Sequence, residues 1–152
     1  KMGYISDLRK VVGSRPLIIV GATLLAINEA NELLLIKRTD NACWGVPGGS
    51  MELGESLEDT LKRETREEIG VDLTDFEFFG VYSGDSQYYK YPNGDEVYVV
   101  ANVFITRVQI EHMIVDPVEH SESRFFDIHH LPENISPPIV PILNDLQKWV
   151  DS

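Results

Sequence analysis

The stretch that decides the fold runs from Gly49 to Val71 and reads GSMELGESLEDTLKRETREEIGV. Its second half, Glu55–Ile69, is the best helix candidate in the chain, and Gly70 is a typical C-terminal stop. The apolar residues of this helix form one stripe because they are spaced by multiples of four: Leu57, Leu61 and Ile69. A loop rich in glycine and proline, Thr39–Gly54, leads into it. The segment therefore predicts a loop, a helix with one apolar face, and a second loop.

Three glutamates share one face of this helix. Glu64, Glu67 and Glu68 are spaced i, i+3 and i+4. In a helix that only faces solvent, such pairs of like charges cost about 0.2–0.5 kcal/mol each. A hard divalent cation removes this conflict, because clustered carboxylate oxygens are its preferred ligands. A solvated charged face is the alternative, but the preceding loop WGVPGG (44–49), whose glycines allow close backbone approach, favours a binding site.

The pattern of these residues resembles the Nudix box, a 23-residue loop–helix–loop signature. The signature consists of Gly, five residues, Glu, seven residues, Arg-Glu, an aliphatic residue, any residue, Glu-Glu, any residue, Gly and an aliphatic residue. Every charged and glycine position is present. The one departure is Thr65, where the family usually has an aliphatic residue, and we expect its hydroxyl to bond to a carbonyl one turn back. The likeness extends to the lead-in, with Lys37-Arg38, Trp44 and Pro47-Gly-Gly49, and to the tail, with Glu119-His-Ser-Glu122, Arg124-Phe-Phe126 and Leu131-Pro132.

The resemblance implies a pyrophosphohydrolase that splits a diphosphate linked to another moiety by means of a metal-bound water. The cofactor that it implies is Mg²⁺, with Mn²⁺ as a substitute. The implied metal ligands are Glu64, Glu67, Glu68 and the carbonyl of Gly48. By the same likeness, Arg63 and Glu55 belong to the catalytic set, because the arginine holds the carboxylates of the box in place. The backbone of Gly48 and Gly49 is also expected to contact the substrate.

The general base stays open among three glutamates. Some members of the family use a glutamate of the box, and others use one from a loop outside it. We place Glu67 first, as both ligand and base, with Glu122 and Glu119 behind it and Asp116 as a lesser candidate. Surface charge is the alternative for the loop residues, because exposed loop carboxylates are common.

Other side chains outside the box are candidates for substrate contact. Arg38, at the end of a predicted strand, is a candidate phosphate ligand, and an exposed arginine without such a role is the equal alternative. Tyr88, Tyr89 and Tyr91 are candidates for stacking on a nucleobase, although hairpin or dimer packing is the preferred interpretation. The histidines show no spacing typical of a metal site.

The remaining pattern predicts an α/β (α+β) fold, in which a mixed β-sheet is sandwiched between helices. The strands expected are Leu17–Ile27, Glu32–Lys37, Phe76–Ser83, Glu96–Arg107 and Arg124–Ile128, and the other helices are Ser6–Val12 and Ile142–Val150. Asn93-Gly94 marks a hairpin before the long strand. With 152 residues and no shift in composition typical of a linker, residues 1–152 are expected to form a single Nudix domain that contains the box at 49–71.

The composition excludes several classes of function. The chain has 13 basic and 25 acidic residues and a net charge of −12, which disfavours a nucleic acid polymer or an anionic membrane as a partner. No uncharged apolar run approaches the roughly 20 residues that a membrane span needs. Cys43 is the only cysteine, which excludes a disulfide framework within the chain and a multi-cysteine zinc site. We therefore expect a cytoplasmic enzyme whose partner is a small nucleotide substrate.

The box does not decide the substrate, because loops outside it recognise the second moiety. A nucleoside triphosphate, especially an oxidised one, is the favoured prediction, and ADP-ribose or another nucleotide derivative comes next. The alternative is a non-catalytic nucleotide-binding regulator, but this chain keeps all four glutamates of the box, at positions 55, 64, 67 and 68. The isomerase branch of the fold is disfavoured by the lone cysteine and the scattered histidines. A homodimer is expected through Tyr4–Val12, placed outside the catalytic core, and the hairpin Tyr88–Tyr98, with a monomer as the alternative.

Overall fold

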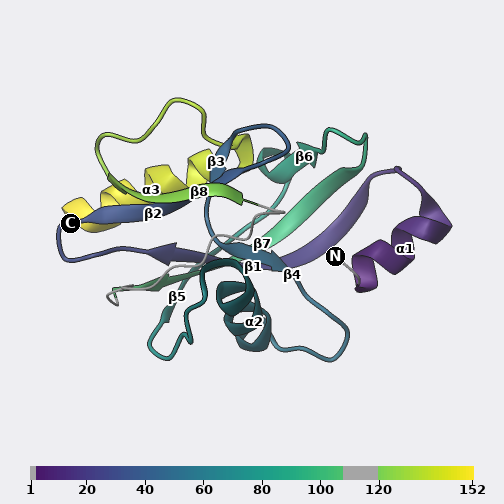
Figure 1. Ribbon diagram of the computed structural model, residues 1–152, viewed down its shortest axis with the longest axis horizontal. Coiled ribbons are helices and arrows are strands. Elements are labelled where there is room, and N and C mark those ends of the chain that lie inside the picture. The colour runs from purple at the N-terminus through teal and green to yellow at the C-terminus, as the bar shows by residue number, and fades with distance from the viewer. Residues whose placement is uncertain (1–2, 108–119) are drawn as a thin grey trace.

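Two β-sheets form the centre of the computed structural model, which describes residues 3–107 and 120–152 (Figure 1). The larger sheet has the order β4-β1-β7-β5, with β6 also paired to β7. β1 and β7 run parallel while the other neighbours run antiparallel, so the predicted mixed sheet is confirmed. Its strands are β1 (Leu17–Ala26), β4 (Gly48–Ser50), β5 (Glu77–Tyr82), β6 (Tyr88–Lys90) and β7 (Glu96–Thr106).

A smaller antiparallel sheet has the order β3-β2-β8. Its strands are β2 (Glu32–Arg38), β3 (Trp44–Gly45) and β8 (His120–Asp127). The structure thus adds a second, smaller sheet to the mixed sheet that the sequence predicts. The reason lies at the turn between β1 and β2, where an isolated bridge between Ile27 and Leu33 replaces a continuous ladder.

The helices lie on either side of the sheets. They are α1 (Tyr4–Val12), α2 (Leu57–Ile69) and α3 (Val140–Asp151), with short 3₁₀ turns η1 (Asp85–Gln87) and η2 (Pro137–Ile139). Figure 1 shows α2 below β1 of the larger sheet and α3 above it, level with the smaller sheet, in the α+β arrangement that the sequence predicts. None of the helices described here is long and apolar enough to cross a membrane.

Each of the two larger helices covers its own hydrophobic cluster. The α2 cluster contains Leu61 and Ile69 of the predicted stripe, both with no exposed surface. Their partners on the sheets include Ala22, Leu24, Leu34 and Phe104. The α3 cluster joins Ile142, Leu143 and Leu146 to Leu25, Leu35, Trp44 and Val103. Burial of the apolar side chains in the α2 cluster contributes about 25 cal/mol of stability per Å² of apolar surface. This packing fixes α2, and hence its glutamates, relative to β1 and β4.

The start of α2 differs from the prediction by two residues. Ser56 caps the helix, because its Oγ accepts a hydrogen bond from the Asp59 amide at 3.0 Å and the Asp59 carboxylate accepts one from the Ser56 amide at 3.2 Å. This reciprocal pair is a capping box. The helix ends at Gly70, which has the left-handed φ of 70° that favours glycine, as predicted. Glu55 therefore lies in the loop before the helix, where its side chain can turn back toward α2.

Several other boundaries also differ. The predicted loop Thr39–Gly54 contains β3 and β4, which are only two and three residues long and depend on pairing with β2 and β1. The last strand begins at His120, four residues before the predicted Arg124. The helix α3 begins at Val140 and keeps Pro141 in its first turn, where the missing amide hydrogen costs no helical bond. The hairpin at Asn93-Gly94 is confirmed, with Gly94 at a φ of 96°.

The prediction for the Thr65 hydroxyl is wrong. Thr65 has no exposed surface, and its Oγ1 has no hydrogen-bond partner among the described residues. Threonine in a helix can take either of two χ1 rotamers, and only some geometries bring its hydroxyl onto a carbonyl one turn back. The described part of the fold therefore leaves this buried hydroxyl without a compensating hydrogen bond.

Candidate active site

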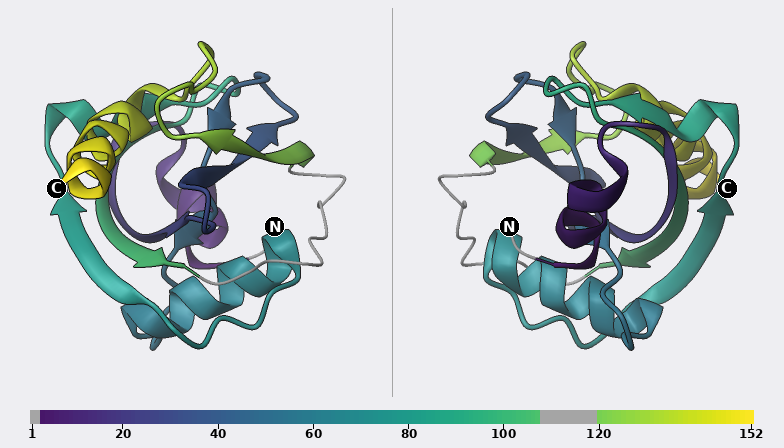
Figure 2. Two further views of the ribbon diagram at one scale, coloured as in Figure 1. Left: turned by 90° about the vertical axis from the view of Figure 1, so that its left-hand side faces the viewer. Right: turned by 90° about the vertical axis from the view of Figure 1, so that its right-hand side faces the viewer.

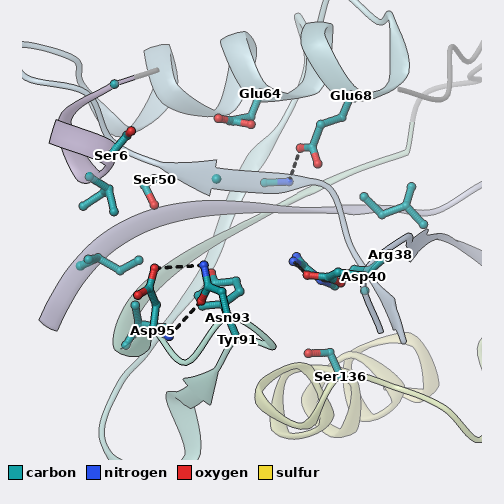
Figure 3. Close-up of a pocket in the computed structure, with 18 of the residues that line it drawn as sticks. Ser6, Arg38, Asp40, Ser50, Glu64, Glu68, Tyr91, Asn93, Asp95 and Ser136 are labelled. Atoms are coloured by element: carbon teal, nitrogen blue, oxygen red, sulfur yellow. Dashed lines mark hydrogen bonds and ion pairs between the residues drawn. The ribbon is translucent and has the colours of Figure 1, made fainter. Parts of the chain in front are cut away.

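A cavity of about 980 Å³ opens beside α2 and β4. Glu64 and Glu68 of α2 line it, as do Gly48 and Gly49 of β4. Figure 3 shows the two carboxylates reaching from the helix toward β4. The sequence predicted this grouping, because Gly49 opens the box that contains Glu64 and Glu68, and Gly48 is its immediate neighbour.

The two glycines of β4 are required by close approach. A Cβ on Gly49 would lie within 3.0 Å of the Glu64 carboxylate, and a Cβ on Gly48 would collide with the backbone oxygen of Ala22. No real side chain tolerates contacts this short. The absence of side chains thus lets the Glu64 carboxylate lie directly against the β4 backbone.

Both cavity glutamates of α2 are nearly buried. Glu64 is 2% exposed and accepts a hydrogen bond from Arg63 Nη1 at 2.8 Å. Glu68 is 5% exposed and accepts one from the Gly48 amide at 2.8 Å. Burying a carboxylate costs free energy unless hydrogen bonds or opposite charges compensate it. The fold therefore keeps two adjacent carboxylates at the wall of an open cavity, although their burial costs free energy. Carboxylate oxygens in this arrangement are suitable ligands for a hard cation.

Arg63 connects the carboxylates of the box. Its Nε and Nη2 donate to the two oxygens of Glu55 at 2.6 and 3.0 Å, and Nη2 also donates to the Ser50 carbonyl at 3.0 Å. This bidentate bond from Arg63 is the main cause that lowers the pKa of Glu55 to about 2. The hydrogen bond to Glu55, and after it the bond to Glu64, raises the pKa of Arg63. Arg63 and Glu55 thus remain charged and hold Glu64 in one orientation.

Glu67 has a different environment from its two neighbours. Its side chain is 48% exposed, and its Oε2 lies 3.7 Å from Arg63 Nη1. It lies at the edge of the carboxylate group rather than on the cavity wall. Within residues 3–107 and 120–152, no three His, Cys, Asp or Glu side chains converge into a ready-made cage for a metal. The role of Glu64, Glu67 and Glu68 as joint metal ligands therefore stays a prediction.

Glu122, the candidate base outside the box that lies within the described residues, is not brought to the cavity. Glu122 on β8 accepts a hydrogen bond from Arg124 at 2.9 Å and lies 4.0 Å from Lys37 Nζ. Lys37 is its cross-strand partner on β2, next to Ile36, which lines the cavity. Because successive side chains of a strand point to opposite faces, Glu122 lies on the face away from the cavity. Glu119 and Asp116 fall outside the described residues.

A second wall of the cavity faces the carboxylates. Arg38, Asp40 and Tyr91 line it, and Figure 3 shows them across the cavity from Glu64 and Glu68. Arg38 donates from Nε and Nη2 to the two oxygens of Asp40 at 2.9 and 2.6 Å. This pairing lowers the pKa of Asp40 and raises that of Arg38. Of the three tyrosines suggested for base stacking, Tyr91 is the one at the cavity.

The helix α1 forms a third wall, which the sequence reasoning missed. Ser6 and Arg9 line the cavity, so the expectation that Tyr4–Val12 lies outside the catalytic core is wrong. The Tyr4 amide donates to Glu52 in the box loop at 2.9 Å, and Arg9 Nη2 donates to the Glu96 carbonyl on β7 at 2.7 Å. The right-hand view of Figure 2 shows α1 in front of the space between the smaller sheet and α2. The acceptor of Arg9 on β7 is the backbone carbonyl of Glu96, and a backbone acceptor leaves no signal in the sequence.

These features define the class of the protein: an α+β domain with a glycine-bearing strand, a glutamate-bearing helix and an open cavity beside them. Residues 18–146 match the NUDIX domain. The chain is 33% identical over 126 residues to an ADP-ribose pyrophosphatase of Methanocaldococcus jannaschii, an alignment that covers 81% of this chain and 70% of the relative. The chain belongs to the Nudix family.

Further comparisons agree with this assignment. The chain is 40% identical over 62 residues to a putative 8-oxo-dGTP diphosphatase of Bacillus subtilis, covering 41% of this chain and 42% of the relative. A crystal structure of a MutT NUDIX hydrolase from Burkholderia pseudomallei superimposes with a TM-score of 0.71 at 26% identity, covering 84% of this chain and 97% of the other. The chain is accordingly a MutT-like hydrolase that acts on acid anhydrides, in a family that generally uses divalent metal cations.

Proposed function

We propose that this protein is a Mg²⁺-dependent pyrophosphohydrolase that cleaves the diphosphate bond of a nucleoside diphosphate derivative. The observation that carries the proposal is the pair of nearly buried carboxylates, Glu64 and Glu68, on the wall of a cavity of about 980 Å³. Pockets of roughly 300–1,000 Å³ are typical of small-molecule sites. The oxygen donors at this wall fit a hard cation, and the wall opposite has the size and polarity to hold the rest of a nucleotide.

The residues have separate roles in this proposal. Glu64, Glu67, Glu68 and the Gly48 carbonyl would hold the cation, for which Mn²⁺ could substitute. When bound, such a cation neutralises phosphate charge and lowers the pKa of a water molecule. Arg63 holds Glu55 and Glu64 in place through its 2.6 and 2.8 Å bonds. Glu67, which is the most exposed of the three ligands, is proposed to accept the proton of the attacking water, with Glu122 as the second candidate.

ADP-ribose is the substrate that we propose first. This order reverses the preference from the sequence, because the ADP-ribose pyrophosphatase relative covers 81% of the chain and the putative 8-oxo-dGTP diphosphatase only 41%. The walls formed by α1 and Arg38 enlarge the cavity beyond the carboxylates, which supports a substrate with groups on both sides of the diphosphate. An oxidised nucleoside triphosphate stays the second candidate.

A nucleotide panel tests the proposal. The wild-type protein should convert ADP-ribose into AMP and ribose 5-phosphate with Mg²⁺ at mildly alkaline pH, and should lose this activity in excess chelator. A triphosphate substrate would instead release diphosphate. The matched control is Asp72→Asn, because Asp72 forms an exposed ion pair with Arg66 beyond the helix and should leave the rates unchanged. Nucleotide binding without turnover would support the regulator alternative and contradict the proposal.

Self-association stays a proposal as well. The segments that suggested a homodimer have partners within the chain: α1 contacts Glu52 and Glu96, and the Tyr88 ring packs on Tyr98 at 5.2 Å. Exposed apolar side chains on the larger sheet, such as Ile18 and Val81, still offer a surface for a second copy. Light scattering would give twice 17.2 kDa for the proposed dimer, and the mass of one chain would contradict it.

A further inference from the structure

We propose that the guanidinium plane of Arg38, held by Asp40 and backed by Tyr91, is the platform on which the flat base of the nucleotide stacks. The inference rests on the proposed function and deepens it, since it places the base at the wall opposite Glu64 and Glu68. It also changes the interpretation of Arg38 from a phosphate ligand to a stacking surface.

The contacts of Arg38 leave its side chain partly exposed at the cavity. Two of its nitrogens are bound to the Asp40 carboxylate at 2.9 and 2.6 Å. Its Cζ lies over the Tyr91 ring, 5.5 Å from the ring centroid. Arg38 nevertheless lines the cavity, and its side chain is 37% exposed. We infer that the exposed part includes the side of the guanidinium plane turned away from Tyr91.

The loop and hairpin that carry the platform are fixed to each other. Asn41 Nδ2 donates a hydrogen bond to the Tyr89 hydroxyl, which joins the loop after β2 to β6. The Tyr89 ring then packs edge-on against Tyr91, with ring centroids 5.0 Å apart. Asn41 also accepts a hydrogen bond from the Cys43 amide at 3.0 Å within the loop. A platform held this way loses little conformational entropy when a ligand binds.

The pairing of Arg38 with Asp40 favours a base over a phosphate as the ligand of Arg38. The Asp40 carboxylate neutralises the guanidinium group and would repel a phosphate that approached the same edge. A guanidinium plane stacks on aromatic rings, and every nucleobase has a π-face. The carboxylates of α2 lie across the cavity, as Figure 3 shows. One nucleotide can therefore place its phosphates at α2 and its base on Arg38.

Binding of two ligands separates stacking from phosphate contact. The base-containing probe is the fluorescent 1,N⁶-ethenoadenosine monophosphate, and the base-free probe is ribose 5-phosphate, measured by competition. Arg38→Lys keeps the positive charge but removes the plane and the bidentate bond. Tyr91→Leu removes the ring behind it, and Tyr91→Phe restores that ring. The matched control is Arg107→Lys. The Cζ of Arg107 lies 5.3 Å from the centroid of the Trp149 ring, and Arg107 is not among the residues that line the cavity.

The proposal expects a specific pattern of affinities. Arg38→Lys and Tyr91→Leu should each weaken the ethenoadenosine probe by about tenfold, which is the scale of a partly desolvated cation–π contact. Tyr91→Phe and Arg107→Lys should bind it like the wild type. None of the variants should change the affinity for ribose 5-phosphate. Thermal unfolding of each variant checks that the fold is kept.

Three results would overturn the platform. The first is equal affinity of the ethenoadenosine probe for the wild type and Arg38→Lys, and the second is no binding of this probe at all. The third is a parallel loss of ribose 5-phosphate affinity in Arg38→Lys, which would mean that Arg38 contacts the phosphate. Failure of the proposed function is a separate result, because it appears as an absence of ADP-ribose hydrolysis whatever the probes do.

Discussion

Arg63 of α2 donates two hydrogen bonds to Glu55 in the box loop, from Nε at 2.6 Å and from Nη2 at 3.0 Å. Glu55 also accepts hydrogen bonds from the Glu52 amide and the Thr60 hydroxyl, each at 2.9 Å. The loop is thereby tied to the helix at the point where the cavity carboxylates begin. This pairing links the stability of the site to the charge of one glutamate.

We predict that Glu55→Gln destabilises the protein in a pH-dependent way. The pKa of Glu55 is lowered from its ordinary 4.5 to about 2 in the folded state. The stabilisation from its charge is therefore present above pH 4.5 and is lost as the pH falls toward 2. Urea unfolding of the wild type and the variant should show a difference at neutral pH that shrinks over this range. A difference that stays constant with pH would contradict the prediction.

We predict that Thr65→Val stabilises the fold by about 1 kcal/mol, because it removes a buried hydroxyl with no hydrogen-bond partner. Valine has a similar shape and keeps the branched Cβ, so no cavity forms. Chemical denaturation measures the change. A loss of stability would mean that the hydroxyl makes a bond that the structure does not contain.

We predict that Arg9→Ala raises KM for the substrate several-fold while kcat stays close to the wild-type value. Arg9 ties α1 to the Glu96 carbonyl and to the chain after the helix, through the carbonyls of Gly13 and Arg15. Loss of these bonds frees one wall of the cavity but leaves the carboxylates in place. Lys10→Ala, in an exposed pair with Asp7, is the control. An unchanged KM would show that α1 is not part of the substrate site.

We predict that Glu67→Gln and Glu122→Gln identify the general base. Loss of a base typically lowers kcat by about 10²–10⁴ with little effect on binding. We expect this loss for Glu67→Gln and a much smaller one for Glu122→Gln, because Glu122 is engaged by Arg124 and Lys37 on the face away from the cavity. Rates measured across neutral and alkaline pH would contradict the order if Glu122→Gln showed the larger loss.

Much of the site could be predicted because its residues are close in sequence. The spacing of Glu64, Glu67 and Glu68 fixes their common helix face, and the Gly48-Gly49 pair lies in the short segment ahead of the helix. The long strands β1 and β7 were also predictable, since runs of valine, isoleucine and leucine mark them. The capping box of Ser56 and Asp59 is also a local sequence pattern, and it indicates the helix start that the structure has.

The features that were missed depend on contacts between distant segments. β4 forms only because β1 offers it an edge, so the local sequence of Gly48–Ser50 does not predict a strand. Arg9 of α1 donates to the backbone carbonyls of Gly13, Arg15 and Glu96, which are acceptors that any sequence would provide. The pairing of Arg38 with Asp40 is local, but its position over Tyr91 results from the docking of a hairpin more than fifty residues away.

The central claim is that the α2 carboxylates hold a catalytic cation, and the rate of ADP-ribose hydrolysis as a function of Mg²⁺ concentration tests it most directly. Glu64→Gln and Glu68→Gln keep the size of each side chain and remove its charge. The wild type should require Mg²⁺, and each variant should lose at least about 100-fold in kcat/KM, with a higher Mg²⁺ requirement, while it keeps the fold. Wild-type rates in both variants, or full activity in excess chelator, would contradict the claim.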